Sequence, residues 1–546
     1  MAELLKPLPD WEEHEKPALP GTASYPWHPL RRRLAYAAIA VLVALTGGLG
    51  NALVSVNLAQ IQAQLGLDPA QGNWLLAAWL MSNVSANLLL FKARQQFGLR
   101  LFTEVGLGLY ALLAIAHLCS GSLLTTVLLR IASGFAGAAC TALGTIYMLQ
   151  AFPRRHVGRA LIIGAGLPQL AVPLAWMLSP ALLELGNWHQ LYLFEAGLAL
   201  CAFAAVSLLK LPPGIQTRVF ARADLLTFAL LAPALALLVA VLSQGQLRWW
   251  FDTPWLGWAL AAAWLLGLLG LALEHHRHSP LLQVRWLLSP LMLRFIAGAF
   301  IIRLLTNEQS FGMVSLLRLL GMGPEQMAPL FAVIALGMVC GIALSALTFG
   351  PRALPWQLAG SILLFAVAAG LDMQRSSVVV PMDLAWSQFL AAAATGIFFG
   401  PLMLIGFRLT LARGTDHVVS FIVVLSLTQT FGGLAGSALL GSWQVHREHV
   451  HSAALSAQHT PANPARQQQL AQYLPALSRT QTDPARVQAL AAAQLAQATR
   501  IQANVRAFND VFALSGLIAV LTLGGGLLLP WLQSLRQRRP APPALH

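Results

Sequence analysis

A few polar side chains interrupt the apolar stretches of this chain, and they are the candidates for chemistry. Arg130 lies in LTTVLLRIASGFAGAACTALGTIYMLQ (124–150), a run long enough to cross a membrane. An arginine in lipid costs roughly 3 kcal/mol on insertion scales, so it normally faces a protein interior or a watery path. Arg130 is therefore either part of a transport path or a structural tie between helices. The other embedded polar residues are Asn83, Asn87, Gln169, Glu195, Arg303, Asn307, Glu308 and Gln429.

Glu308 is the embedded acid best suited to carry a proton. It follows Arg303 by five residues, about 140° around a helix, so the two charges need not pair and Glu308 is free to meet another helix. A carboxyl group in a low-dielectric cavity favours its protonated form. Proton carrier and buried salt-bridge partner both stay open for Glu308. Glu195, beside Tyr192, is better explained as a salt-bridge or interface residue.

Composition identifies a polytopic membrane protein. Of 546 residues, 57% are hydrophobic and 10% charged, against roughly 25% charged in soluble domains. The net charge of +14 is explained by basic cytoplasmic loops, so no nucleic-acid partner is expected. The four cysteines form no CxxC pair, so no disulfide framework is predicted. No metal site is predicted either, because no second ligand cluster accompanies His446, His449 and His451. No P-loop spacing or clustered nucleophile is present, so we expect neither a cofactor nor an enzyme.

The elements that position these residues are about fourteen apolar runs of spanning length. Along the chain, loops rich in Lys and Arg alternate with loops that are poor in them. Because the basic loops of membrane proteins are usually cytoplasmic, this pattern predicts that both termini are cytoplasmic. The predicted spans are 34–58, 72–91, 101–119, 124–149, 160–182, 190–210, 224–243, 255–273, 294–317, 328–349, 357–373, 384–408, 417–442 and 511–532.

The spans divide into two groups. We predict an all-α protein with a flexible cytoplasmic tail (1–33), a six-helix bundle (34–210), a linker with two extra spans (211–293), a second six-helix bundle (294–532) and a cytoplasmic tail (533–546). Within the second bundle, residues 446–510 are rich in Ala and Gln, which favours helix. Prolines interrupt this stretch. It therefore predicts a helical hairpin outside the membrane, either a passive elaboration or a docking arm for a partner.

In order and spacing, several motifs resemble the major facilitator superfamily, specifically the fourteen-span EmrB/QacA-type drug:proton antiporters. The likeness covers nearly the whole chain beyond residue 34, and Arg130 occupies the fourth-span arginine. The first-half motifs are GNALVSVNLAQIQAQLG (50–66), FKARQQFGLRLF (91–102) and LLRIASGFAGAACTALGTIYMLQAFP (128–153). The second-half motifs, which resemble the EmrB branch, are AWSQFLAAAATGIFFGPLML (385–404), SLTQTFGGLAGSAL (426–439) and VHREHVHSAAL (445–455).

The chain departs from the family pattern at its acidic positions. The first-span acid falls on Gly50 and its proline on Ala59. Either coupling has moved to Glu308 or Glu195, or this branch is driven differently. The conformational motifs that the resemblance assigns are the loop motif and the fifth span. In the loop motif, which also contains Gly98 and Arg100, the family's leading glycine falls on Phe91 and its aspartate on Gln95. In the fifth span, Pro168 and Pro173 can bend the helix.

The resemblance implies two bundles that rock around a central cavity. It also implies a multi-pass exporter of amphipathic toxic compounds or drugs in the bacterial inner membrane, in contact with membrane lipid and coupled to protons. A periplasmic adaptor of the EmrA/HlyD type and an outer-membrane channel would be partners, with 446–510 as the contact. The alternative is an importer or facilitator of a small organic solute on the same fold, which would have no evident use for the hairpin.

Overall fold

The computed structural model is helical throughout the part of the chain that it describes. It describes residues 5, 11–12, 15–17, 21–183, 187–277, 280–414, 417–458, 464–479 and 483–537. Residues 1–4, 6–10, 13–14 and 18–20 of the predicted N-terminal tail, 538–546 of the predicted C-terminal tail, and two stretches of the predicted hairpin, 459–463 and 480–482, lie outside the described residues. An isolated antiparallel bridge pairs Ala23 with Gly214.

The described residues include 14 helices long and apolar enough to cross a membrane, so the predicted all-α fold of two bundles with two inserted helices is confirmed. The first half consists of α1 (Leu30–Val56), α2 (Leu58–Leu65), α3 (Pro69–Phe97), α4 (Leu99–His117), α5 (Leu123–Ala151), η1 (Arg154–His156), α6 (Val157–Gly166), η2 (Leu167–Leu170), α7 (Ala171–Leu183) and α8 (His189–Leu208).

The rest of the chain follows the same pattern, with one long extension near its end. Its elements are α9 (Arg222–Gln244), α10 (Pro254–His276), α11 (Val284–Leu287), α12 (Pro290–Leu305), η3 (Glu308–Met313), α13 (Val314–Leu319), α14 (Pro324–Leu347), α15 (Leu354–Asp372), η4 (Pro381–Leu384), α16 (Ala385–Leu411), α17 (Val418–Gln458), α18 (Pro464–Leu477) and α19 (Pro484–Gln537).

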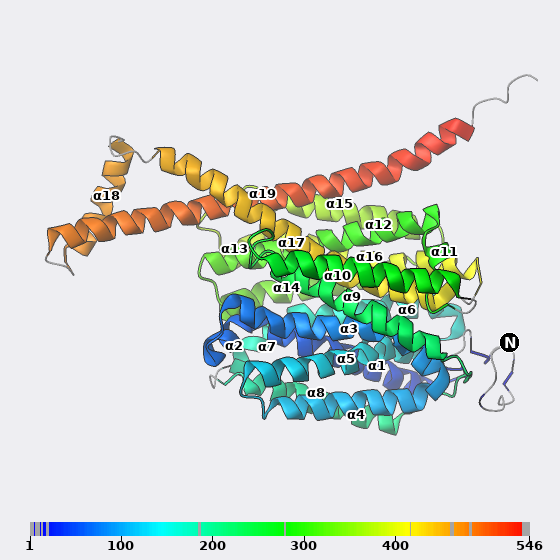
Figure 1. The fold of residues 1–546 in the computed structure, drawn as a ribbon. Helices are drawn as coiled ribbons and strands as arrows, with labels where there is room; N and C mark the ends of the chain where they lie inside the picture. Colours follow the sequence, from blue (N-terminus) through cyan, green and yellow to red (C-terminus); the bar gives the residue numbers. More distant parts are fainter. Residues whose placement is uncertain are drawn as a thin grey trace, which may run out of the picture.

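The two ends of the molecule are distinguished by the chain terminus and the long helices. Figure 1 shows the N-terminus at one end of the bundles and α17, α18 and α19 projecting from the other. We call these ends the terminal side and the hairpin side. Helix starts on the hairpin side are encoded by caps: the Asp68 carboxylate accepts from the Gln71 N–H at 2.6 Å, and Ser122 Oγ accepts from the Thr125 N–H at 3.3 Å.

Helix α5 forms the centre of the first bundle and packs against α1, α3 and α4. Small residues permit the close approach: a Cβ at Gly134 would overlap with the Trp79 carbonyl on α3, and one at Gly144 would press on Ala44 of α1. Both glycines therefore allow α5 to approach its neighbours closely.

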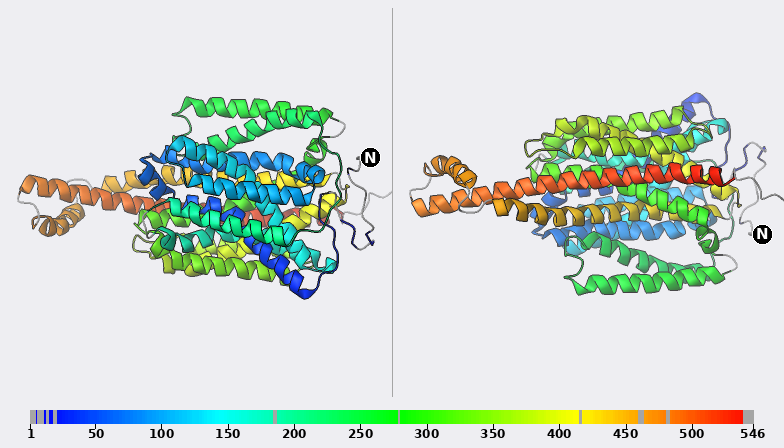
Figure 2. Two further views of the ribbon diagram at one scale, coloured as in Figure 1. Left: turned by 90° about the horizontal axis from the view of Figure 1, so that it is seen from below. Right: turned by 90° about the horizontal axis from the view of Figure 1, so that it is seen from above.

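The inserted helices α9 and α10 form a separate layer at the edge of the bundles (Figure 2). On the terminal side Asp224 binds Lys92 of α3 and Arg277, each at 2.8 Å, and Arg277 also binds Glu274 at 2.5 Å. Burial alone would lower the pKa of Arg277, but its bonds to Asp224 and Glu274 hold the pKa above the ordinary value. These charges anchor the inserted pair to the first bundle.

The hairpin is an extension of two membrane helices. Helix α17 continues to Gln458, α19 returns from Pro484, and α18 packs on α19 (Figure 1). Where α17 and α19 meet, the Asp510 carboxylate accepts from Arg447 Nε at 2.6 Å and lies 2.7 Å from His451 Nε2. His451 is therefore a partner of a carboxylate on the facing arm.

Candidate functional site

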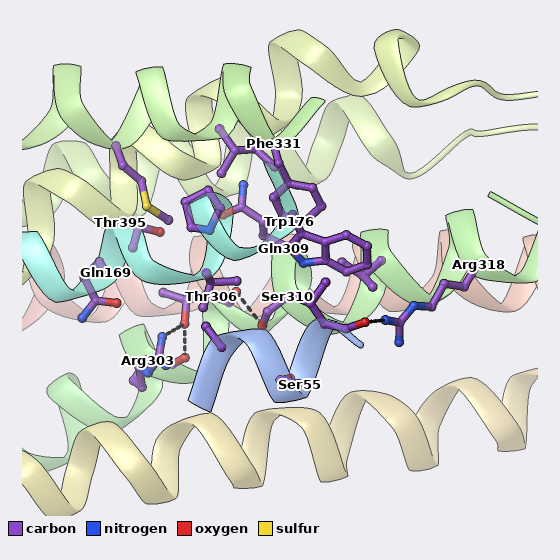
Figure 3. A pocket seen from close by; sticks show the side chains of 17 residues that line it. Ser55, Gln169, Trp176, Arg303, Thr306, Gln309, Ser310, Arg318, Phe331 and Thr395 are labelled. Atoms are coloured by element: carbon purple, nitrogen blue, oxygen red, sulfur yellow. Dashed lines mark hydrogen bonds between the residues drawn. The ribbon is translucent and has the colours of Figure 1, made fainter. Parts of the chain in front are cut away.

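A cavity of about 200 Å³ lies between the two bundles (Figure 3). Helices α1 and α7 with η2 supply one wall, and α12, η3, α13, α14 and α16, with Thr306 between α12 and η3, supply the other. The lining residues are Ala52, Ser55, Val56, Gln169, Val172, Pro173, Trp176, Arg303, Thr306, Gln309, Ser310, Val314, Arg318, Phe331, Ile334, Met338 and Thr395.

This lining contains two guanidinium groups and no carboxylate. Arg303 donates from Nε to the Gln429 carbonyl at 3.2 Å and from Nη1 to Thr306 Oγ1 at 2.6 Å. Arg318 donates to the Val56 carbonyl at 2.8 Å and lies 5.1 Å from the ring centroid of Trp176. All these partners are neutral, so both positive charges remain available to an anion in the cavity.

Aromatic and aliphatic side chains close the cavity on the hairpin side. Trp176 of the first bundle stacks on Phe331 of the second, with ring centroids 4.7 Å apart and an interplanar angle of 4°. They belong to a continuous apolar cluster that joins the bundles and includes Leu53 and Leu317. On the terminal side the cluster that joins the bundles around Ile162 is much smaller. The more extensive seal is therefore on the hairpin side.

A buried carboxyl cluster adjoins the cavity. The Gln388 side-chain amide donates to Asp372 Oδ2 at 2.8 Å and faces Glu308 Oε1 at 3.4 Å. All three side chains are at most 1% exposed. Arg375 binds Asp372 at 2.7 Å. The cluster thus contains two carboxyl groups and one cation, and Glu308 has the amide as its partner.

Gln309 connects this cluster to the cavity. It lines the cavity, and its Nε2 donates to both the carbonyl and Oε1 of Gln388, each at 3.1 Å. Glu308 and Gln309 open the π-helical turn η3, which interrupts the ninth span. Such turns often occur at functional sites, because the extra residue re-aims neighbouring side chains. Glu308 faces Gln388 of α16, on a different helix.

Arg130 lies inside the first bundle and does not line the cavity. It is 1% exposed. Its guanidinium donates to Asn51 Oδ1 at 2.5 Å, to the Leu75 carbonyl at 3.1 Å and to the Gly50 carbonyl at 3.3 Å. Arg130 therefore cross-links α5 to α1 and α3 through neutral acceptors.

Glu195 lies on the other side of Gly50. The Tyr110 hydroxyl donates to Glu195 Oε1 at 2.5 Å. A Cβ at Gly50 would overlap with that carboxylate and with the Tyr110 hydroxyl. The first-span position that lacks an acid in the sequence is thus filled in space by a carboxyl group from α8.

The other predicted polar residues are dispersed. Asn83 donates to the Gly134 carbonyl at 3.1 Å, and Asn87 donates to the Asn83 carbonyl at 2.9 Å. Asn307 accepts from Ser437 Oγ at 2.9 Å. Of the nine embedded residues, Gln169 and Arg303 line the cavity. The Gln429 amide is buried beside it without a hydrogen-bond partner among the described residues.

The loop-motif residues join α3 to α4. Gly98 has φ +84°, a conformation that favours glycine, and it separates the two helices. Arg100 donates to the Leu211 carbonyl at 3.1 Å, and the Gln95 carbonyl accepts from the Thr217 N–H at 3.1 Å. Phe91 is buried in α3, which continues beyond the predicted end of the second span.

The two prolines of the fifth span lie near the middle of the membrane path. Pro168 lies in the 3-10 turn η2, which separates α6 from α7. Pro173 lies in the first turn of α7 and lines the cavity. Because proline lacks an N–H and its ring obstructs the preceding turn, this break in the span is encoded locally.

Sequence reasoning missed Gln309, Arg318, Asp372, Arg375 and Gln388. Asp372 carries the clearest signal, since it ends an apolar run three residues before Arg375, a spacing at which side chains meet on a helix. Gln388 and Gln309 are neutral amides, and which helix they face is set by packing between helices rather than by spacing.

Two bundles of membrane-spanning helices around a central cavity are the architecture of a membrane transporter. The family model described as Major Facilitator Superfamily matches residues 40–439, and the chain belongs to this family. The chain is 25% identical over 375 residues, 65% of its length, to the uncharacterized transporter YebQ of Escherichia coli (strain K12), of which 77% is covered.

Two further similarities extend over most of the chain. It is 24% identical over 521 residues to the triacylglyceride transporter of Mycolicibacterium smegmatis (strain ATCC 700084 / mc(2)155), covering 89% of this chain and 86% of the relative. The crystal structure of the human organic anion transporter MFSD10 (TETRAN) matches with a TM-score of 0.52 and 13% identity over 90% of this chain and all of that one. The structural likeness shows the fold.

Proposed function

We propose that the protein is a secondary active exporter of amphipathic organic anions, coupled to protons through Glu308. The observation that carries this proposal is the composition of the central cavity: Arg303 and Arg318 supply positive charge without a carboxylate, and Trp176 and Phe331 supply an apolar surface. A carboxylate or sulfonate on an apolar body satisfies both features. Its charge replaces the missing counter-ion, and its body contacts the aromatic wall.

Coupling is assigned to the carboxyl cluster. The cluster contains two carboxyl groups and one guanidinium, and Arg375 contacts Asp372. Ionised Glu308 would be a buried charge without a cation, so a proton balances it. Gln309 contacts both the cavity and Gln388. A substrate that moves Gln309 would change the hydrogen bonds that hold Glu308 and thereby favour proton release.

The direction of transport is inferred from the seal and from the sequence. The bundles are closed most extensively on the hairpin side, so this conformation is suited to loading from the terminal side. The resemblance to EmrB/QacA-type drug:proton antiporters supports a cytoplasmic terminal side, an inner-membrane location and drug-like substrates. A relative of this chain is a triacylglyceride transporter, which supports cargo with a large apolar part.

Transport in proteoliposomes tests the proposal. A fluorescent anionic amphiphile and its uncharged ester are loaded outside, and a pH gradient of either sign is imposed. We expect gradient-dependent uptake of the anion, with KM raised about tenfold in Arg303→Gln and Arg318→Gln because a charge-assisted contact is lost. Arg413→Gln, at an exposed arginine on the terminal side, should behave as wild type. Equal transport of the ester, or uptake without a gradient, would contradict the proposal and favour a facilitator.

The hairpin is proposed to contact a periplasmic HlyD/EmrA-type adaptor that leads to an outer-membrane channel. The exposed side of α19 at Gln497 is the position for a photo-crosslinking amino acid, with Arg413 as the control on the opposite side. Capture of an adaptor of that class at Gln497 alone is the expected result. No such adduct in cells that contain the adaptor would remove the tripartite part and leave the transport proposal standing.

A further inference from the structure

A second cavity, of about 190 Å³, opens between the bundles on the terminal side. Helices α3, α5 and α6 of the first bundle face α16 and α17 of the second across it, and α4 completes the wall. None of its lining residues belongs to the central cavity. It is lined by Thr22, Asn87, Leu90, Phe91, Arg94, Phe102, Ala142, Thr145, Ile146, Leu149, Leu161, Met403, Phe407 and Ile422.

Arg94 is the charged residue of this lining, and no described residue gives it a hydrogen bond or an ion pair. It is 8% exposed. Its contact with the described part of the chain is the ring of Phe91, 4.7 Å from the guanidinium carbon to the centroid, and its Nε is buried without an acceptor. A buried guanidinium without a counter-ion is costly. The missing interaction is therefore one that an anionic group would supply.

Neighbouring basic residues on the same side of the membrane are satisfied. Lys92, two positions before Arg94, binds Asp224 at 2.8 Å, and Arg100 donates to the Leu211 carbonyl at 3.1 Å. Of these two buried cations of α3, Lys92 has a counter-ion and Arg94 has none among the described residues. A general excess of basic residues at this membrane face does not explain Arg94, because such residues would be solvated at the surface and Arg94 is buried.

The remaining surface of the cavity fits an apolar tail. Asn87 and Thr145 are the polar side chains that come from membrane helices, and the other helical residues are aliphatic or aromatic. Arg94 lies in the last turn of α3, the depth at which charged headgroups meet the hydrocarbon region. An amphiphile with its head at this depth would place its tail along Phe102 and Phe407.

We propose that this cavity is a loading site for amphiphiles with a carboxylate or phosphate head, in which Arg94 binds the head. The inference deepens the proposed function and rests on it for the direction of travel, but the binding site itself does not depend on transport. Free fatty acids and anionic phospholipids share this chemistry. Both reach the cavity from the terminal side, where the two bundles are less extensively joined.

Photolabelling of the full-length protein tests the site. The protein is placed in phosphatidylcholine nanodiscs with palmitic acid that carries a diazirine on its tail, and labelled peptides are identified by mass spectrometry. We expect labels within 87–102, 142–149 and 403–422, and about tenfold less labelling at equal probe concentration in Arg94→Gln because one charge-assisted contact is lost. Arg94→Lys should recover part of the labelling, and Arg413→Gln should label as wild type.

Competition separates the two sources of ligand. If unlabelled oleate displaces the probe and phosphatidylglycerol does not, the site takes free fatty acids; the opposite result assigns it to anionic lipid. Equal labelling of wild type and Arg94→Gln, or equal labelling by the diazirine-bearing alcohol, would overturn the proposal. Arg303→Gln should leave these labels unchanged while it impairs transport, so failure of the site and failure of the transport function give different results. Elution as a single monodisperse peak verifies that each variant is folded.

Discussion

The carboxylate of Glu195 lies in the space that a side chain at Gly50 would occupy. Gly50 also accepts a hydrogen bond from Arg130 through its carbonyl at 3.3 Å. One residue without a side chain therefore separates a buried acid on α8 from a buried arginine on α5. Gly50 lies within the regular helix α1, so its backbone conformation does not require glycine. What requires glycine is the space that the Glu195 carboxylate and the Tyr110 hydroxyl occupy.

Gly50→Ala tests this relationship. The new methyl group would displace Glu195 and break its bond to Tyr110, so we expect destabilisation of about 1–3 kcal/mol, as overpacking of a core usually costs. Gly298→Ala is the matched control, because it is also a helical glycine but meets open space. Thermal unfolding in detergent measures both. An unchanged midpoint for Gly50→Ala would show that the carboxylate is not confined there, and addition of Glu195→Ala should relieve the strain.

Arg130→Lys tests the structural side of the buried arginine. Three acceptors, at Gly50, Asn51 and Leu75, surround a planar group that donates in fixed directions, and an ammonium ion cannot reproduce that fork. We expect a lower unfolding midpoint and loss of transport in Arg130→Lys and Arg130→Ala, with membrane insertion retained. Midpoint and transport rate are measured on the same preparation. Wild-type transport in Arg130→Ala would exclude the residue from the mechanism.

The spans, the exposed arms and the buried arginine could be predicted from the sequence, because length and hydropathy determine them locally. What surrounds each polar residue could not. Arg94 reads as one of the basic residues at a loop, yet α3 continues to Phe97 and buries it. Gln388 joins two carboxyl groups only because α15, α16 and η3 meet at one point. The rotation of each helix about its axis arises from packing between helices, which hydropathy does not determine.

Glu308→Gln tests proton coupling without removing a hydrogen-bond acceptor. The amide oxygen can still accept from Gln388, but the group can no longer release a proton. Among the groups around Glu308, Asp372 is the charged one. The other elements packed against η3 supply neutral side chains: Val511 and Phe512 come from α19, and Ser437 of α17 binds Asn307. We expect transport by Glu308→Gln to become independent of the pH gradient.

Gln309→Ala tests whether the link between the cavity and the carboxyl cluster is needed for proton coupling. It breaks the connection between the cavity and Gln388 and leaves the titrating group intact. Gradient dependence should weaken without disappearing. If Glu308→Gln kept the full dependence of wild type on the pH gradient, measured by uptake into proteoliposomes at several internal pH values, the proton would have to bind elsewhere.

The root of the hairpin connects to the same carboxyl cluster. Asn509 of α19 accepts from the Arg375 N–H at 3.1 Å and donates to the Arg375 carbonyl at 2.9 Å. The next residue, Asp510, binds Arg447 and His451 of α17. Arg375 in turn binds Asp372. A change at the buried carboxyl groups therefore has a short physical route to the base of both arms.

Asp510→Ala should loosen the two arms, because Arg447 and His451 both lose their carboxylate. These groups are about 30% exposed or less, so we expect a modest loss of about 1 kcal/mol or less for each partly exposed pair. Limited proteolysis measures it as faster cleavage between 440 and 510. Arg486→Ala is the control, since the ion pair of Arg486 with Asp483 is long, 3.9 Å, and exposed. Equal cleavage rates in the two variants would mean that apolar packing alone holds the arms together.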